Sequence, residues 1–225
     1  MLVVALVAGA AGIVAGVPAT ALAYSVPLEG PVRLSPRQWR WHSVSGWRAV
    51  GPSVLTGVVA ASVCARLPLS LVLPAFWLFA VGATALAIID VRTFRLPHVL
   101  SGALAATFGV AMIAESLARQ DGDSLITACA AGSGAFLLML AVALILPGQL
   151  GLGDVSLAGV IAMSLGWIDL AMAARGLLIG TTIQALLAGV AFAIYAGDRR
   201  RRIAFGPALL TGWVAAVLLQ GAPDW

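Results

Sequence analysis

Long apolar runs, separated by short polar segments, account for most of the 225-residue chain. A helix that crosses the hydrocarbon core of a bilayer needs about 20 mainly apolar residues. Eight runs meet or approach that length: residues 2–24, 50–65, 67–89, 98–118, 124–146, 155–166, 170–196 and 203–220. The pattern therefore predicts an all-α fold, a polytopic membrane bundle of about eight transmembrane helices, built as a single domain over residues 1–225.

Three of these runs allow another interpretation. Residues 155–196 form one apolar stretch that is too long for a single span, and Gly166-Trp167-Ile168-Asp169 offers a tight turn within it, so a short sixth span and a seventh are expected. The first run resembles a secretory signal peptide at Ala21-Leu22-Ala23, a set of small residues typical of a cleavage site. It lacks the basic residues that precede such a run, which favours a retained first span.

Composition places the chain in the membrane. Hydrophobic residues make up 61% of the sequence and charged residues only 10%, whereas charged residues are about a quarter of a soluble domain. The net charge of +4 is more consistent with anionic lipid headgroups than with nucleic acid, because no basic arm is interleaved with stacking aromatic residues. Cys64 and Cys129 lie singly inside apolar runs, so no zinc site, other metal site or cofactor is predicted.

Arginine predicts the orientation. With the N-terminus outside and eight spans, three arginines are outside, Arg66, Arg119 and Arg175, and ten are inside: Arg33, Arg37, Arg40, Arg48, Arg92, Arg95, Arg199, Arg200, Arg201 and Arg202. This asymmetry agrees with the positive-inside rule. Residues 25–48 are then a basic cytoplasmic loop that also carries Trp39, Trp41 and Trp47, a composition typical of a membrane-surface segment.

Two aspartates stand where an apolar run meets a polar segment. Asp90 ends the third run, and Asp154 follows Gly151-Leu152-Gly153 at the start of the sixth. Two predicted spans separate them, so both are expected on the cytoplasmic side. A single aspartate at such a junction is often only solvated among the headgroups, but an ionisable residue at the edge of a bilayer is a functional candidate. Their shared side makes the pair a candidate active site.

Two neighbouring carboxyl groups suit the hydrolysis of a peptide bond. Because the two groups do not easily ionise at the same time, one keeps a proton while the other acts as a base on a shared water. The ionised acid would take a proton from the attacking water, and the protonated acid would stabilise the oxyanion and later help to protonate the amine. Gly151 and Gly153 would let an extended substrate backbone approach Asp154, and they also suit a turn into the sixth span.

Three motifs in a fixed order resemble those of a known family. They are Asp90 with Leu96-Pro97, then Gly151-Leu152-Gly153-Asp154-Val155, then Phe205-Gly206-Pro207 before the last span. In this order and spacing they resemble the type IV prepilin peptidases, the membrane aspartic endopeptidases of the GxGD type, over roughly residues 67–220. Asp90 and Asp154 match the catalytic positions of that family. The positions expected to contact substrate are Pro97, Gly151, Gly153, Phe205, Gly206 and Pro207.

The resemblance implies an eight-span enzyme of the bacterial cytoplasmic membrane. Such an enzyme removes the short basic leader from pilin and pseudopilin precursors at the cytoplasmic face. This chain has Ser156 where the family often has lysine and His98 where it often has asparagine, differences that bear on the substrate. The larger bacterial members carry a cysteine-rich loop that binds zinc and accompanies N-methylation. Residues 25–48 contain no cysteine, so peptidase activity without methyltransferase activity is expected.

Other functions compete with this interpretation. Pro207-Ala208-Leu209 also occurs near the catalytic aspartates of presenilin-like intramembrane proteases, but those proteases have tyrosine before the first aspartate, where this chain has Ile89. An ion-coupled transporter would also keep acids near the membrane, although its site is expected near the midplane between two related halves. A non-catalytic assembly partner with the same fold is a third alternative. Replacing either aspartate distinguishes them, because only a protease would lose peptide cleavage.

Overall fold

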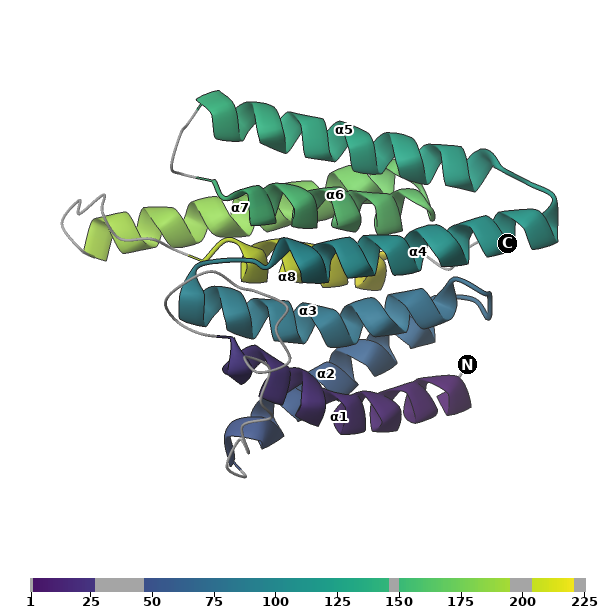
Figure 1. Cartoon of the computed structure of the whole chain (residues 1–225), viewed down its shortest axis with the longest axis horizontal. Coiled ribbons are helices and arrows are strands. Elements are labelled where there is room, and N and C mark those ends of the chain that lie inside the picture. The colour runs from purple at the N-terminus through teal and green to yellow at the C-terminus, as the bar shows by residue number, and fades with distance from the viewer. Residues whose placement is uncertain (1, 27–46, 146–149, 195–203, 221–225) are drawn as a thin grey trace.

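The computed structural model describes residues 2–26, 47–145, 150–194 and 204–220, and these form eight helices and no strand (Figure 1). The helices are α1 (Leu2–Ser25), α2 (Trp47–Arg66), α3 (Leu73–Thr93), α4 (His98–Arg119), α5 (Asp123–Ile145), α6 (Leu152–Gly166), α7 (Leu170–Ile194) and α8 (Gly206–Leu219). The predicted all-α bundle is confirmed. The central parts of the predicted loops, residues 27–46, 147–149 and 197–202, lie outside the described residues.

Six of the eight helices are long and apolar enough to cross a membrane, and the protein is therefore a multi-pass membrane protein. The other two, α6 and α8, are apolar but have only 15 and 14 residues. At 1.5 Å per residue they are about 22 and 21 Å long, less than the roughly 30 Å of a hydrocarbon core. The sequence predicts a short sixth span, and the structure shows that the eighth is equally short.

Three differences between the predicted and observed boundaries concern α2, α3 and α6. Helix α3 begins at Leu73 instead of residue 67, because Pro74 at its first turn favours a helix start there. Helix α2 begins at Trp47, inside the predicted loop over residues 25–48. The third difference concerns the acids, since α3 continues past Asp90 and α6 begins before Asp154. Each carboxylate is thus part of a helix end and not of a polar connection.

The turn predicted between the sixth and seventh helices is present. Helix α6 ends at Gly166, Trp167 and Ile168 form the turn, and α7 begins at Leu170. Hydrogen bonds from the backbone N–H groups of Ile168 and Asp169 to the carbonyl of Leu165 close the turn at 3.0 Å each.

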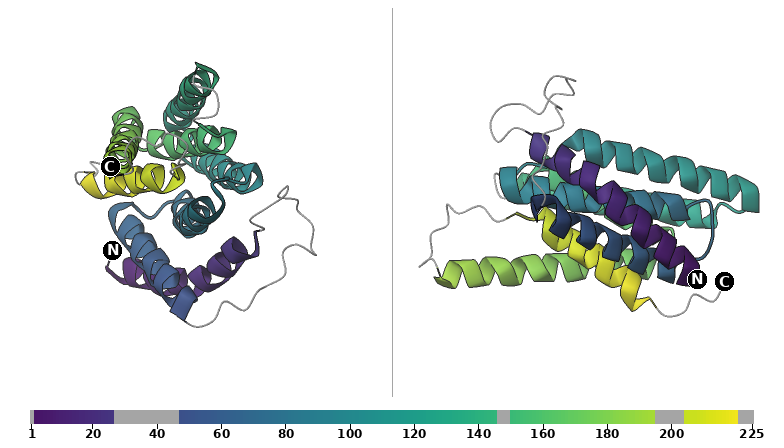
Figure 2. Two further views of the ribbon diagram at one scale, coloured as in Figure 1. Left: turned by 90° about the vertical axis from the view of Figure 1, so that its left-hand side faces the viewer. Right: turned by 90° about the horizontal axis from the view of Figure 1, so that it is seen from below.

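Helices α3 and α6 are the two central elements of the bundle (Figures 1 and 2). Helix α3 packs against α1, α2, α4 and α8, and α6 packs against α4, α5, α7 and α8. Aromatic rings fill the space between them: Phe79 of α3 lies 4.7 Å from Trp213 of α8 and 5.6 Å from Phe108 of α4, measured between ring centroids. The Nε1–H of Trp213 donates a 3.0 Å hydrogen bond to Ser164 of α6. The core therefore joins both central helices through α8.

Small residues allow two helix pairs to approach closely. In the α1–α2 pair, a Cβ atom on Gly57 would come within 2.8 Å of the carbonyl oxygen of Gly9. In the α7–α8 pair, a Cβ atom on Gly212 would come within 2.8 Å of the Cα atom of Gly180. Close contacts between small residues are a common basis for helix association in membranes, where apolar side chains gain nothing by leaving lipid.

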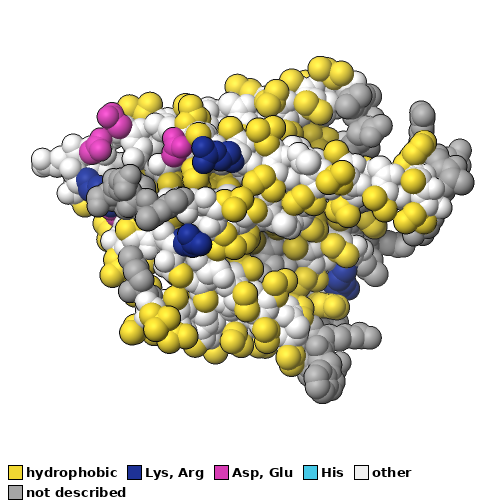
Figure 3. Space-filling view, turned by 180° about the vertical axis from the view of Figure 1, so that it is seen from behind, with side chains coloured by type: hydrophobic (Ala, Val, Ile, Leu, Met, Phe, Trp, Pro, Cys, Tyr) yellow, Lys and Arg dark blue, Asp and Glu magenta, His cyan; other side chains and the backbone are white. Residues whose placement is uncertain are grey.

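The outer surface has the distribution expected of a membrane protein. Many large apolar side chains face outward along the helices, and one face of the molecule shows Asp and Glu side chains only at one end (Figure 3). The described acids at that end are Glu115, Asp121, Asp123 and Asp169. Asp90 and Asp154 lie at the opposite ends of the antiparallel helices and are separated from these residues by the length of the bundle.

Candidate active site

Asp90 lies in the last turn of α3 and is only 4% exposed. Its Oδ2 atom accepts a 2.7 Å hydrogen bond from the backbone N–H of Gly206. Gly206 is the first residue of α8, so this carboxyl group faces the positive end of a helix dipole. A residue 116 positions further along the chain therefore helps to fix the orientation of Asp90.

The backbone reverses direction immediately after Asp90. Phe94 has a left-handed conformation, with φ 50° and ψ 33°, and its N–H donates a 2.8 Å hydrogen bond to the carbonyl of Asp90. The hydroxyl of Thr93 donates to the carbonyl of Ile89 at 2.8 Å. Pro97 then precedes α4 as its N-cap, with φ −68°, the value that its ring favours. These contacts hold the end of α3 in one conformation.

Asp154 lies in the first turn of α6. Gly151 is the N-cap of this helix, and its N–H donates a 3.3 Å hydrogen bond to the Oδ2 atom of Asp154. An acidic residue here satisfies a free backbone N–H and interacts favourably with the helix dipole. The Oδ1 atom of Asp154 is buried and has no hydrogen-bond partner among the described residues. One oxygen thus orders the helix start, and the other is left for chemistry.

Leu96 connects the two acid-bearing segments. A Cβ atom on Gly153 would lie 2.6 Å from the Cβ atom and 2.7 Å from the carbonyl oxygen of Leu96, so these backbones are in close contact. A Cβ atom on Gly206 would lie 3.3 Å from Cδ1 of the same leucine. Leu96 is 7% exposed. One buried apolar residue therefore sets the spacing between the end of α3, the start of α6 and the start of α8.

Leu96 and Gly206 bring the two carboxyl groups to one site. They come from the two central helices, and each is associated with the N-terminus of one of the two short helices, α6 or α8. Neighbouring carboxyl groups do not both ionise readily, so such a pair can offer a base and a proton donor together. This combination can activate a water and protonate a leaving group, as peptide hydrolysis requires.

The other predicted site residues occupy distinct positions around the acids. Pro97 is buried at the start of α4, and Phe205 is the N-cap of α8. Pro207 follows in the first turn of α8, where proline favours helix initiation. The N–H of Gly206 is occupied by Asp90. Contacts of these residues with substrate remain predictions.

The sequence analysis did not identify Leu96 as a site residue, although it belongs to the Leu96-Pro97 motif. An apolar side chain carries no chemical signal, and its role depends on two glycines that are distant in the chain. The sequence analysis also missed the hydrogen bond between Gly206 and Asp90, because it joins residues that are distant in the chain. A glycine followed by proline indicates a helix start, but it does not indicate which carboxylate that helix start will meet.

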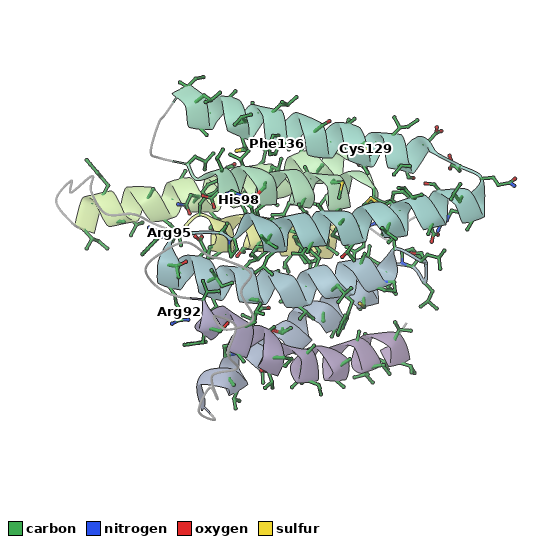
Figure 4. The ribbon with its side chains drawn as sticks, in the orientation of Figure 1. Arg92, Arg95, His98, Cys129 and Phe136 are labelled. Atoms are coloured by element: carbon green, nitrogen blue, oxygen red, sulfur yellow. The ribbon has the colours of Figure 1, made fainter. Side chains whose placement is uncertain are left out.

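Basic residues surround this end of α3. Figure 4 shows Arg92, Arg95 and His98 where α3 leads into α4. Arg92 donates a 3.0 Å hydrogen bond from Nη1 to the carbonyl of Ala23, and its guanidinium lies 4.1 Å from the ring centroid of Tyr24. Arg92 therefore attaches the end of α1 to the end of α3. Within the described residues, no group of three or more His, Cys, Asp and Glu side chains could hold a metal ion.

A comparison with known protein families matched residues 77–197, more than half of the chain, to the type IV leader peptidase family. The chain belongs to this family. The match contains both Asp90 and Asp154 and ends before Gly206. Neither the curated proteins nor the solved structures gave a match. Membership makes the protein a leader-peptidase-like protease, and it confirms the resemblance inferred from the three motifs.

Proposed function

We propose that this leader peptidase is an aspartic endopeptidase that removes the basic leader from type IV prepilin-like precursors, either pilins or pseudopilins. The observation that carries the proposal is the pairing of Asp90 and Asp154. Both residues lie within the family match, they come from separate central helices, and contacts of Leu96 and Gly206 join the helix ends that carry them. Nothing in this arrangement calls for a metal ion or an organic cofactor.

The proposed reaction uses one proton shared by the two acids. The ionised carboxylate removes a proton from a water while the water oxygen attacks the scissile carbonyl, and the protonated carboxyl group gives its proton to the carbonyl oxygen. The tetrahedral intermediate then breaks its C–N bond, the amine leaves with a proton from the first carboxyl group, and a hydroxyl proton of the intermediate returns to the second carboxylate. The buried and unpartnered Oδ1 atom of Asp154 supports this role, because it has no structural hydrogen bond to break.

We further propose that cleavage occurs at the cytoplasmic face of the bacterial cytoplasmic membrane. The acids lie at the end of the bundle that carries Arg92 and Arg95, and the positive-inside rule assigns that end to the cytoplasm. Partners are then the precursor and membrane lipid, with no nucleic acid. We expect no N-methylation of the new terminus, since the loop over residues 25–48 lacks the cysteines of the methylating relatives.

The proposal is tested by replacing each acid with its amide. Asp90→Asn and Asp154→Asn keep the size of the side chain but cannot take or share a proton. Each should lower the rate of cleavage of a prepilin from the same genome by at least about 100- to 10,000-fold, the usual contribution of general acid–base catalysis. The double variant should be scarcely slower than either single one, because the two acids act as a unit.

The exposed acids at the other end of the bundle provide matched controls. Asp121→Asn and Asp169→Asn make the same chemical change far from the pair and should cleave at the wild-type rate. All four variants should elute as monodisperse protein in detergent. A folded Asp154→Asn protein that still cleaves at the wild-type rate would exclude the aspartic mechanism. A wild-type protein that cleaves no prepilin would exclude the proposed substrate.

A further inference from the structure

Helix α7 carries a glutamine, Gln184, in its second half. The amide oxygen of Gln184 is buried and has no hydrogen-bond partner among the described residues. By contrast, the hydroxyl of Thr181, one turn earlier, bonds to the carbonyl of Leu177 in its own helix at 2.8 Å. A buried polar group without a partner is costly, especially within a bilayer, and a functional contact would account for its presence.

The packing of α7 against α8 places Gln184 at the level of the acids. Gly176 of α7 lies against Gly212 of α8, and one turn later Gly180 lies against Leu209. The two helices are therefore antiparallel, and each further turn along α7 corresponds to one turn back along α8. Gln184 is on the same stripe as both glycines, at the i+4 spacing. It is thus level with the start of α8.

That start of α8 is part of the candidate active site. Gly206 donates its N–H to Asp90, so the layer that contains Gln184 also contains one carboxylate of the pair. Helix α6 gives the same result. Gly176 of α7 contacts Leu165 of α6, and the two helices are antiparallel. Gln184, two turns after Gly176, is therefore about two turns nearer to the level of Asp154. Gln184 therefore lies within the layers that hold the two acids.

On this basis we propose that Gln184 is a substrate-binding residue whose side-chain amide hydrogen-bonds to a main-chain peptide group beside the scissile bond. The inference rests on the proposed peptidase function. A peptide group offers one N–H donor and one carbonyl acceptor, and a glutamine amide offers the complementary pair. An extended substrate that leaves water must have its backbone groups satisfied.

The surrounding charges favour a neutral amide for this task. Of the acids in the described residues, only Asp90 and Asp154 lie at this end, and Arg92 and Arg95 are nearby. The N–H groups of Gly206 and Gly151 are already used by the two carboxylates. Within the described residues, no further acid at this end is available to recognise a basic leader. A contact with the main chain suits substrates that differ in sequence but share an extended backbone.

The test compares two glutamines, each with a buried amide oxygen that has no hydrogen-bond partner among the described residues. Gln220, at the other end of α8, also has a buried amide oxygen without a partner. Gln184→Met and Gln220→Met each remove such an amide while keeping the length of the side chain. Steady-state cleavage of a purified full-length prepilin from the same genome would be measured for both variants in detergent, together with the temperature of unfolding.

We expect Gln184→Met to raise KM about tenfold with kcat within about threefold of the wild type, the pattern of lost ground-state binding by one hydrogen bond. Gln220→Met should leave both constants unchanged. Neither variant should unfold at a lower temperature, because removal of an unsatisfied buried polar group is neutral or stabilising. Gln184→Leu repeats the test if the Met variant is not recovered folded.

A folded Gln184 variant with wild-type KM would overturn the inference and leave the peptidase function intact. An equal rise in KM for the Gln220 variant would also overturn it, because the effect would then come from packing. If the wild-type protein itself cleaves no prepilin while its unfolding is normal, the proposed function fails, and the inference fails with it. The activity of the wild type thus separates the two failures.

Discussion

The two glycines of Gly151-Leu152-Gly153-Asp154 have different roles. Gly153 is buried against the backbone of Leu96, where a Cβ atom would lie 2.7 Å from a carbonyl oxygen that cannot move independently. Gly151 is exposed, with φ −81°, and a Cβ atom there would lie 3.3 Å from Oδ2 of Asp154. A side chain at Gly151 would therefore require a small shift of the Asp154 carboxylate, whereas Gly153 is required by the contact between the backbones of α6 and the α3–α4 connection.

The backbone contact at Gly153 predicts a large effect of alanine at that position. Gly153→Ala should push the start of α6 away from Leu96, and a displacement of about 1 Å at the acid pair should lower kcat/KM by about 100-fold. Gly134→Ala, its matched control on α5, adds a methyl group where nothing lies within 4 Å and should stay within about threefold of the wild type, as for most substitutions at exposed sites. Cleavage assays on both variants give the ratio of their kcat/KM values. Equal losses would show that Leu96 does not set the position of Asp154.

The acid pair could be proposed from the sequence, but the contacts around it could not be predicted. Asp90 and Asp154 are chemically distinctive, and the number of spans between them fixes their shared side. Leu96 and Gln184 have no such signal. The role of Leu96 follows from its contact with Gly153, and that of Gln184 from the pairing of α7 with α8. Contacts between distant segments are set by packing, which a hydrophobic pattern does not specify.

At the scale of elements, the short helices α6 and α8 are the ones that contact the acids. Ten of the 15 residues of α6 are buried, so neighbouring helices, and not lipid, surround most of it. A helix enclosed by protein need not match the bilayer thickness, because its end can meet polar groups inside the bundle. Both helices direct their N-termini toward a carboxylate. The sequence predicted the short length of α6 but not this shared function.

Two close helix pairs should respond differently to the same substitution. Gly57→Ala crowds α1 against α2, and Gly212→Ala crowds α7 against α8. Each should destabilise the protein by about 1 to 3 kcal/mol through overpacking. Only Gly212→Ala should also lower kcat/KM well below the unfolding temperature, because it displaces the helix that donates to Asp90.

Thermal unfolding in detergent and cleavage assays at low temperature measure these two effects. Gly102→Ala serves as the control, since a Cβ atom on Gly102 would meet nothing within 4 Å. This variant should be active and no less stable than the wild type, because alanine favours a helix over glycine. If Gly57→Ala lost as much activity as Gly212→Ala, displacement of α8 would not be the cause of the lower kcat/KM.

At the scale of the whole molecule, hydrophobic runs and arginines were enough to predict the order of the helices and one orientation. The eight observed helices follow the eight runs, because each run is long enough to require burial in lipid or protein. The arrangement of these helices around α3 and α6 was not predictable in this way (Figure 2). It depends on which small residues face each other, and alanine and glycine are frequent in every helix of this chain.

The orientation itself is the last prediction. His98, beside the acid pair, should face the cytoplasm, and Asp121, at the other end of α4, should face outward; both side chains are exposed. In a background with Cys64→Ala and Cys129→Ala, a membrane-impermeant maleimide applied to intact cells should label Asp121→Cys and not His98→Cys. Opening the cells should make the second cysteine reactive. Labelling of His98→Cys from outside would place the acid pair on the outer face, where a leader that stays in the cytoplasm could not reach it.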